Sequence, residues 1–312
     1  MQYDVLVSVV IPMYNREAFI REAIDSVLKQ SFQQFEIIVL DDCSTDNSCA
    51  EVEAIDDSRI ILYYAKEKSG ISKLRNIGNN MTRGKYICVM DSDDIIPDYR
   101  LQEEFDFLEA NVDVGVVGGH CKLFGLRDNM MMANYDSDTI NCGHIFRTLL
   151  FHGTAMIRKS VLDEFSIQYN EESFVGEDWG LWVDMINKVK MVNLDRIFLY
   201  YRIHDNNISA TSTSNKEIKA KRKDTIDRIQ IRAIKNLGLV LNDEELIAFN
   251  NFYREADEDL EPPTYDNYED IKKILKTMQT QANHLDINAE AFEKYSNEWT
   301  EKMARRHGIL ND

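Results

Sequence analysis

Short runs of apolar residues alternate with segments of helical spacing along the first third of the chain. The runs are rich in β-branched residues, as is typical of strands covered on both faces, and they span Val5–Ile11, Phe35–Leu40, Arg59–Tyr64 and Tyr86–Met90. Between the runs, the spacing predicts helices that follow an N-cap at Asn15, end near Ile55 and span Ser72–Met81. This alternation predicts an α/β fold with a mainly parallel sheet, which binds ligands beyond the carboxyl ends of its strands.

The pattern is less regular in the middle of the chain. It predicts a helix over Leu101–Leu108 and further strands over Val114–Val117, Cys121–Phe124, His152–Arg158 and Val192–Arg202. Residues 127–143 have no clear period, and we interpret them either as a poorly ordered loop or as a lid over a ligand.

From residue 213 onward the chain is charged and amphipathic. Helices are predicted over Lys216–Leu237, Glu244–Phe252, Ile271–His284 and Ala289–Arg306. We therefore expect one domain over residues 1–212 and a C-terminal helical region over residues 213–312. The region could cover exposed core, mediate dimerisation or bind a partner, and the sequence does not discriminate among these roles.

Two of the predicted strands end in carboxylates. Asp91, Asp93 and Asp94 follow one of them, and a cation is expected among carboxylates this close together. Oxygen ligands select Mg²⁺ or Mn²⁺, which commonly bridge to nucleotide phosphates. The alternative is a solvated acidic turn in which Asp94 caps a helix. Because Asp41 and Asp42 end a second strand at the same edge, the pattern favours a nucleotide with a metal ion.

The composition restricts the partners further. The 312 residues are 44% hydrophobic and 29% charged, as in ordinary globular proteins. The net charge of −18 argues against nucleic acid as a partner. The five cysteines match no common zinc spacing, and no stretch approaches the roughly 20 apolar residues of a membrane span. We expect a soluble, cytoplasmic protein with reduced thiols.

Four stretches in a fixed order carry a resemblance to a known family. They are Val7–Asn15 (VSVVIPMYN), Asp41–Asp46 (DDCSTD), Gly70 with Lys73, Arg75 and Asn76, and Asp91–Asp94 (DSDD). Together they resemble the nucleotide-sugar half of family 2 glycosyltransferases with the GT-A fold, over roughly residues 5–205. The resemblance implies a Rossmann-like mixed sheet flanked by helices, with a nucleotide-sugar half over about residues 1–98 and an acceptor half over about residues 99–212. Cys43 departs from the family, which usually has glycine there.

The resemblance implies that the first two motifs bind the nucleoside. Asp42 would accept the imide N–H of a uracil, with Asp41 beside it. The base and ribose pocket would be lined by Pro12, Tyr14 and Glu17. Lys73 and Arg75 would supply positive charge near the base or the phosphates, or would simply form the solvated face of their helix.

The resemblance also implies roles for the Asp-x-Asp motif. Asp91 would contact the ribose, with Ser92 next to it in the donor site, and Asp93 would bind Mn²⁺ or Mg²⁺. Asp94 would support the site or cap a helix.

The acceptor half would contribute the catalytic base. In the stretch Glu177-Asp-Trp-Gly-Leu-Trp182, Asp178 is preferred over Glu177 as the base that deprotonates the acceptor hydroxyl. Acids in a first helical turn are also favoured by the helix dipole, so a structural role could explain both. Trp179 and Trp182 would form an apolar wall against the sugar or belong to the core. His152 would precede the acceptor site or be a core histidine bonded to a backbone group.

The last motif follows the strand Val192–Arg202. His204 would approach the metal or the diphosphate, and Arg202 would pair with phosphate or with an acid of the site. Ser209 would close over the diphosphate.

The resemblance therefore implies a metal-dependent, inverting glycosyltransferase. Its donor would be a UDP-sugar and its acceptor a saccharide or lipid-linked glycan, in surface polysaccharide assembly at the inner face of the membrane. Peripheral membrane contact and homo-oligomerisation through the C-terminal helices stay open. A nucleotidyltransferase is disfavoured because Tyr14–Ala18 contains no glycine. An inactive nucleotide-sugar-binding or scaffolding module is the other alternative.

Overall fold

The computed structural model describes residues 5–133, 135–173, 175–204, 216–254 and 262–311. These residues form two compact units, which we treat separately. Unit 1 contains the described residues within 1–135, 150–173 and 189–212, and unit 2 contains those within 136–149, 174–188 and 213–312. The predicted boundary at residue 213 thus coincides with one of several points at which the chain passes between the units. Ser209 lies outside the described residues.

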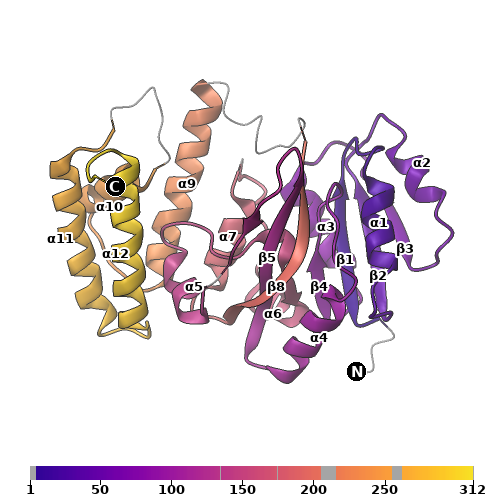
Figure 1. The fold of residues 1–312 in the computed structure, drawn as a ribbon, viewed down its shortest axis with the longest axis horizontal. Coiled ribbons are helices and arrows are strands. Elements are labelled where there is room, and N and C mark those ends of the chain that lie inside the picture. The colour runs from indigo at the N-terminus through magenta and orange to yellow at the C-terminus, as the bar shows by residue number, and fades with distance from the viewer. Residues whose placement is uncertain (1–4, 134, 174, 205–215, 255–261, 312) are drawn as a thin grey trace. The chain divides into compact units, whose positions relative to one another are not determined.

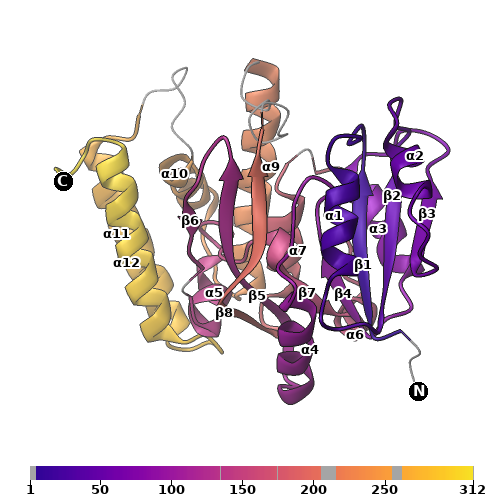
Figure 2. The same ribbon diagram turned by 45° about the vertical axis from the view of Figure 1, so that its right-hand side comes forward.

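Unit 1 is built on one mixed sheet with the strand order β3–β2–β1–β4–β7–β5–β6, in which β8 pairs with β5. The strands are β1 (Val7–Met13), β2 (Phe35–Asp41), β3 (Ile60–Tyr64), β4 (Tyr86–Val89), β5 (Val114–Gly125), β6 (Met130–Met131), β7 (Met156–Arg158) and β8 (Lys190–Ile203). The first four strands pair in parallel, and β5 and β8 also run parallel and side by side (Figure 2).

Helices cover both faces of the parallel strands. Unit 1 contains α1 (Ile20–Leu28), α2 (Ser48–Glu53), α3 (Ile71–Met81), α4 (Arg100–Ala110), the 3₁₀ turn η1 (His152–Thr154) and α6 (Lys159–Phe165) (Figure 1). On one face, Val9 and Ile11 of β1 share a core with Ile24 of α1. On the other face, Gly78 of α3 packs so closely that a Cβ atom there would lie 2.7 Å from the Val10 side chain. This double coverage explains why β1 and β2 are apolar without alternation.

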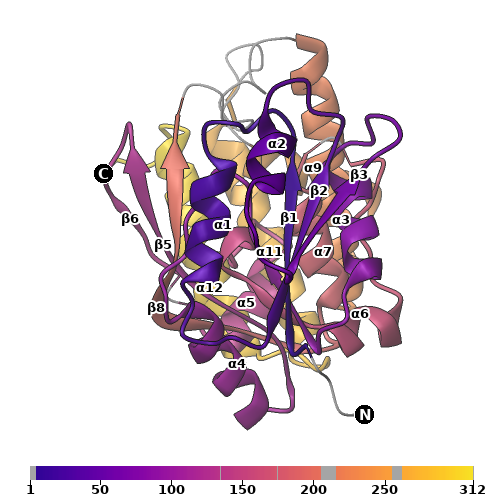
Figure 3. The same ribbon diagram turned by 90° about the vertical axis from the view of Figure 1, so that its right-hand side faces the viewer.

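The strand order reverses between β1 and β4. The chain moves outward from β1 to β2 and β3 (Figure 3) and then returns through α3 to place β4 on the other side of β1. In open α/β sheets, ligands bind at the carboxyl ends of the strands beside such a reversal. The loops after β1, β2 and β4 are therefore the expected site, as the sequence predicted.

Several predicted elements need correction. The two strands predicted over Val114–Val117 and Cys121–Phe124 are one strand, β5, because register shifts against β8 interrupt its apolar pattern without ending it. The predicted strand His152–Arg158 is a 3₁₀ turn followed by the short strand β7. Asn15 is not the N-cap of α1, which begins at Ile20; its side-chain oxygen instead accepts the N–H of Thr45.

Residues 127–143 contain regular structure that their composition hides. Met130 and Met131 form β6 at the edge of the sheet, and Ser137–Gly143 form the helix α5. The side chain of Asp136 accepts the N–H of Thr139 and so caps α5.

Unit 2 is helical. It contains α5 together with α7 (Glu177–Met185), α9 (Lys216–Asn236), α10 (Asp243–Tyr253), α11 (Tyr265–Ala282) and α12 (Ala289–Arg306). The four C-terminal helices were all predicted, and α10 and α11 begin with complete capping boxes at Asn242 and Thr264. Among the described residues, none of the helices combines the length and apolarity that crossing a bilayer requires.

Candidate functional site in unit 1

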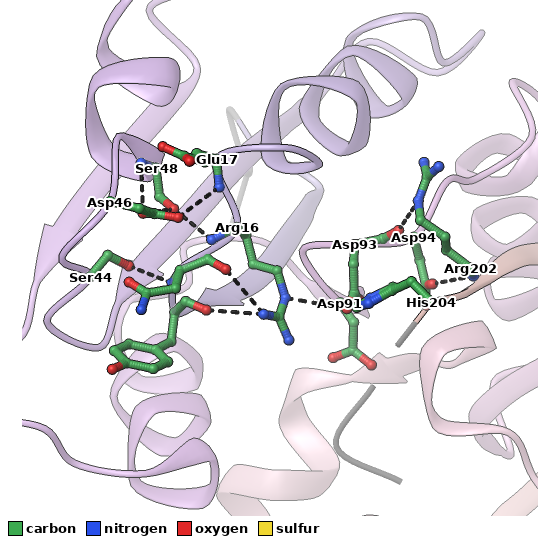
Figure 4. Close-up of polar contacts among 12 residues, drawn as sticks. Arg16, Glu17, Ser44, Asp46, Ser48, Asp91, Asp93, Asp94, Arg202 and His204 are labelled. Carbon is green, nitrogen blue, oxygen red and sulfur yellow. Dashed lines mark hydrogen bonds and ion pairs between the residues drawn. The ribbon is translucent and has the colours of Figure 1, made fainter. Parts of the chain in front are cut away.

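Loops from four strands of unit 1 meet at the carboxyl edge of its sheet. The residues after β1, β2, β4 and β8 contribute side chains that contact one another (Figure 4). β8 reaches this edge because the backbone of Tyr200 pairs with that of Ile95, with N···O distances of 2.8 and 3.1 Å. That pairing fixes the end of β8 beside the Asp-x-Asp motif.

The loop after β1 is bonded to the loop after β2. The backbone N–H of Asn15 donates to the Ser44 hydroxyl at 2.9 Å, and that of Arg16 donates to the Ser48 hydroxyl at 2.6 Å. Glu17 accepts the backbone and side-chain N–H groups of Asn47 at 2.9 and 2.8 Å. Glu17 therefore holds this loop pair together in the structure.

Asp41 and Asp42 are both buried at the end of β2. Asp42 accepts the backbone N–H groups of Ser69 and Gly70 at 2.6 and 3.1 Å, and Asp41 accepts that of Ser44. Asp42 is thus a fixed carboxylate with two of its lone-pair positions used, and further lone pairs can accept from a ligand.

Cys43 has a φ of +64°. This is the left-handed region, in which glycine is favoured because it has no Cβ atom. The backbone of Cys43 therefore has the conformation that favours glycine, although this chain has cysteine where the family usually has glycine. The turn keeps its shape with a cysteine in a strained conformation.

Pro12 and Tyr14 occupy different environments. Pro12 is buried within β1, whereas Tyr14 is 37% exposed directly after it. The Lys68 ammonium group lies 3.5 Å from the centroid of the Tyr14 ring. The exposed ring of Tyr14, on the loop that is bonded to the residues after β2, is available for stacking on a flat ligand.

Each acid of the 91–94 motif has its own basic or N–H partner. Asp91 pairs with Arg75 at 2.8 Å, and the backbone N–H of Arg202 donates to Asp94 at 2.9 Å. Asp93 forms an ion pair with Arg16, at 3.3 Å, and lies 3.1 Å from the His204 ring. Arg75 and Arg16 therefore supply positive charge among the acids, and the divalent ion stays a prediction.

Arg75 and Lys73 differ in how far their side chains are buried. The side chain of Arg75 is only 6% exposed, so its interpretation as part of a solvated helix face is wrong. Lys73 is 43% exposed and lies 3.9 Å from Glu67. Arg75 faces the site because it lies two positions further along α3 than Lys73, on another side of the helix.

Arg202 is held by several groups at once. Its guanidinium donates to the Asp93 carbonyl at 2.8 Å and to Glu22 of α1 at 2.6 Å. It also lies over the rings of Phe19 and Phe124, at 5.1 and 4.4 Å from their centroids. The Arg202 side chain therefore pairs with Glu22, an acid that was not predicted for the site, and pairing with phosphate stays a prediction.

Asp94 is neither solvated nor a helix cap. It is 1% exposed, and the next helix, α4, begins only at Arg100. Burial, together with the charges of Asp91 and Asp93, raises the pKa of Asp94 well above its usual range. The acidic-turn alternative is therefore wrong, and Asp94 joins the motif to the end of β8.

A buried arginine supports the motif from beneath. Arg100 is fully buried and donates to the carbonyl groups of Val89, Gly153 and Ala155, at 3.2, 2.8 and 3.3 Å. It also pairs with the equally buried Glu104 at 3.0 Å. These bonds join the last residue of β4 to η1, and so fix the strand end that carries the acids.

His152 lies deeper in unit 1, on η1. Its Nε2 lies 2.7 Å from the Tyr169 hydroxyl. Burial, together with the charges of Arg75 and Arg100, lowers the pKa of His152 well below its usual range. His152 is therefore a neutral residue of the core.

The fit of a divalent ion depends on Asp93 and His204. Their contacting atoms are 3.1 Å apart. Neighbouring ligands of an octahedral ion with bonds of about 2.1 Å lie about 3 Å apart, so the pair suits Mg²⁺ or Mn²⁺. Within the described part of the chain, no group of three or more His, Cys, Asp or Glu side chains is arranged to hold a metal. An ion here would take its other ligands from phosphate and water, as Mg²⁺ commonly does.

The predicted base belongs to unit 2. Glu177 and Asp178 open α7 after Gly176, whose φ is +67°, and the Asp178 carboxylate accepts the N–H of Trp179 at 2.7 Å. Trp179 and Trp182 are buried in unit 2, so their core interpretation is the one that the structure supports.

Arg16 is the site residue that the sequence analysis missed. Its charge is unremarkable in a polar loop, but the parallel pairing of β1 with β4 brings it to Asp93. The available signal was its position immediately after a predicted central strand, at the edge where the acids were expected.

Comparison with known proteins identifies the family. The model of the family described as Glycosyl transferase family 2 matches residues 8–165, half of the chain, including both acidic strand ends. The chain belongs to this family. The predicted family, enzyme class and fold class are confirmed.

Curated relatives of this glycosyltransferase include two from Escherichia coli, WfaP and WfgD. Both are named UDP-Glc:α-D-GlcNAc-diphosphoundecaprenol β-1,3-glucosyltransferases. WfaP is 28% identical over 208 residues, which cover 66% of this chain and 80% of WfaP. WfgD is 29% identical over 226 residues, which cover 69% of this chain and 83% of WfgD.

Solved structures share the fold of the glycosyltransferase. Staphylococcus aureus TarS in complex with UDP-GlcNAc has a TM-score of 0.67 and 18% identity, covering 99% of this chain and 93% of that one. The mannosyltransferase PcManGT from Pyrobaculum calidifontis, in complex with GDP-Man and Mn²⁺, has a TM-score of 0.58 and 17% identity, covering 97% and 88%. At these identities the likeness concerns the fold alone.

Proposed function

We propose that this glycosyltransferase transfers a sugar from a UDP-sugar to a hydroxyl group of a saccharide or lipid-linked glycan, with inversion at the sugar carbon. One observation carries the proposal. Asp42, Asp91, Asp93 and His204 all lie at the carboxyl edge of one sheet, where the strand order reverses. The names of both E. coli relatives specify UDP-Glc as donor and a diphosphoundecaprenol-linked acceptor, which supports both choices. Surface polysaccharide assembly at the cytoplasmic face of the membrane is the matching role.

Unit 1 binds the donor in this proposal. Asp42 accepts the imide N–H of uracil, for which its two backbone bonds hold it in place. Tyr14 stacks against the base, and Asp91, held by Arg75, accepts from the ribose hydroxyls. Lys68, beside Tyr14, adds positive charge that attracts an anionic donor.

Asp93 and His204 would hold the divalent ion, which would neutralise charge on the diphosphate leaving group. The protein keeps both ligands oriented without it. His204 stacks on Phe19 at 4.7 Å between ring centroids, and Arg202 fixes the Asp93 backbone. Such support reduces the reorganisation that binding requires.

The base in this proposal is Asp178, in the first turn of α7. Asp178 removes the proton from the acceptor hydroxyl as its oxygen attacks the anomeric carbon and the bond to the diphosphate breaks. Asp178 lies in the first turn of α7, where its carboxylate accepts the backbone N–H of Trp179 at 2.7 Å.

The test is an Asp178→Asn substitution. We expect loss of sugar transfer by at least about 100-fold, the typical contribution of a general base, while UDP binding with Mn²⁺ changes little. Transfer is measured with a panel of UDP- and GDP-sugars and GlcNAc-diphospholipid acceptors, and binding by calorimetry. Anomeric configuration of the product, read by NMR, tests inversion.

Two further variants sharpen this test. Asp184→Asn changes an acid of the same helix that pairs with Arg232, and should leave transfer near the native rate. Glu177→Gln examines the alternative base. Full activity in Asp178→Asn would refute the assignment, and wild-type protein that binds no UDP would refute the donor.

A further inference from the structure

Arg16 and His204 contact the same oxygen atom of Asp93. The Arg16 Nε lies 3.3 Å from Oδ2, and the His204 Nε2 lies 3.1 Å from it (Figure 4). The three side chains are only 16%, 14% and 12% exposed, for Arg16, His204 and Asp93 respectively. The oxygen that a metal ion would use is therefore already paired with a guanidinium group.

The Arg16 guanidinium is held in this position. Its NH1 donates to the carbonyl groups of Tyr14 and Asn15 at 3.2 and 3.1 Å. Its backbone N–H donates to Ser48, and the preceding residue, Asn15, has a φ of +50°. The side chain consequently curls back on its own loop and points toward Asp93, rather than extending into solvent.

We infer that Arg16 weakens metal binding at Asp93 until the donor diphosphate is present, so that metal and nucleotide bind cooperatively. The inference rests on the proposed function, and it assigns to Arg16 the control of that coupling. Arg16 is a positioning residue in this inference, because it acts on the metal only through its contact with Asp93.

The physical basis is competition between cations. A divalent ion on Oδ2 must replace the contact with Arg16 and then stand close to its positive charge, in a site that is largely shielded from water. The two negative charges of a diphosphate offset this repulsion. Because coupling free energies are reciprocal, UDP should strengthen Mn²⁺ binding by the same factor by which Mn²⁺ strengthens UDP binding.

The experiment compares wild type with Arg16→Met, which keeps much of the side-chain length and removes the charge. The dissociation constant of Mn²⁺ is measured by electron paramagnetic resonance of the free ion, without nucleotide and with saturating UDP. We expect Arg16→Met to bind Mn²⁺ alone roughly tenfold more tightly, which corresponds to about 1.4 kcal/mol, because the competing guanidinium charge is gone. The enhancement by UDP should shrink by a similar factor.

Two control variants separate charge from structure. Arg16→Lys keeps the positive charge and should retain most of the coupling. Arg21→Met removes an arginine of α1 that pairs with Glu51 and is 45% exposed, and should leave Mn²⁺ affinity and coupling as in wild type. Circular dichroism of each variant verifies that the fold is kept.

The outcomes distinguish this inference from the proposed function. If wild type binds UDP and Mn²⁺ but Arg16→Met binds Mn²⁺ no more tightly, the role of Arg16 is wrong and the donor site stands. A tighter Mn²⁺ site in Arg21→Met as well would also overturn the role, because the effect would then follow net charge. If neither wild type nor Arg16→Met binds UDP under any condition, the proposed function itself fails.

Discussion

Individual residues of the site are defined by their partners. Three acids lie within four positions of the chain, but their partners come from distant segments. Asp91 pairs with Arg75, and Asp93 pairs with Arg16. Asp94 accepts the backbone N–H of Arg202. Carboxylates this close would otherwise repel one another. Asp91 and Asp93 are therefore paired with arginines in the structure, and a cation that binds either carboxylate must compete with these contacts.

Cys43 offers a test of backbone strain at the same scale. Its φ of +64° costs an L-residue about 1–2 kcal/mol, and glycine avoids this but loses about 0.5–1 kcal/mol through the entropy of the unfolded chain. We expect Cys43→Gly to raise the free energy of unfolding by up to about 1 kcal/mol, measured by urea denaturation. Cys43→Val should lower it.

The matched control is Cys49→Gly, within the helix α2. Glycine is unfavourable in a helix, so this change should destabilise the protein by about 1 kcal/mol. A destabilising effect at both positions would contradict the strain at Cys43.

At the scale of elements, α5 shows how a buried helix can lack a visible period. Asp136 caps it, and its buried residues include Ile140, Cys142 and Gly143. With so few turns and small residues on the buried side, hydrophobic spacing gives a weak signal. The helix owes its position to packing within unit 2 rather than to its own sequence.

His144, at the end of α5, makes unit 2 sensitive to acid. Burial lowers the pKa of His144 to about 3, from an ordinary value of 6.5. The unfolded chain therefore binds a proton more readily, and stability is lost as the pH falls from 6.5 toward 3. Between pH 7 and pH 5, the burial of His144 should lower the free energy of unfolding by about 2 kcal/mol.

We expect this loss to disappear in His144→Leu. Urea unfolding of both proteins is followed at several pH values, and the free energy of unfolding of wild type should fall relative to that of His144→Leu by about 2 kcal/mol between pH 7 and pH 5. The exposed His284, changed to leucine, serves as control. Parallel pH profiles for wild type and His144→Leu would show that His144 is not buried as described.

At the scale of the whole molecule, unit 2 joins segments that are far apart in the chain. Phe146, from the segment after α5, packs against Phe249 and Tyr253 of α10 and Tyr295 of α12, with ring centroids 4.9 to 5.9 Å apart. Asn288, the N-cap of α12, donates to Asp138 of α5 at 2.7 Å. The C-terminal helices therefore share a core with the middle of the chain.

Phe146→Ala tests that shared core. Removing a buried aromatic ring should cost about 3–5 kcal/mol, measured by chemical denaturation, and should speed amide exchange in α10 and α12. Phe165→Ala, at a position 36% exposed, should cost far less. Unchanged exchange in α10 and α12 would mean that these helices are stable without the middle segment.

The sequence alone determined the family, the strand and helix alternation, the acidic strand ends and the four C-terminal helices. These features depend on local signals: continuous apolar runs, helical spacing and motifs a few residues long. The sequence also indicated that positive charge should lie among these acids, because like charges repel whatever the fold.

Only the tertiary structure decided which cations these are and which helices share a core. Arg16 meets Asp93 because β1 pairs with β4, and His204 does so because β8 pairs with Ile95 after the motif. Likewise, α5 is bonded to the N-cap of α12 through Asp138 and Asn288, which lie 150 residues apart in the sequence. Such contacts link residues distant in sequence, and strand order and helix packing set them, so no local pattern encodes them.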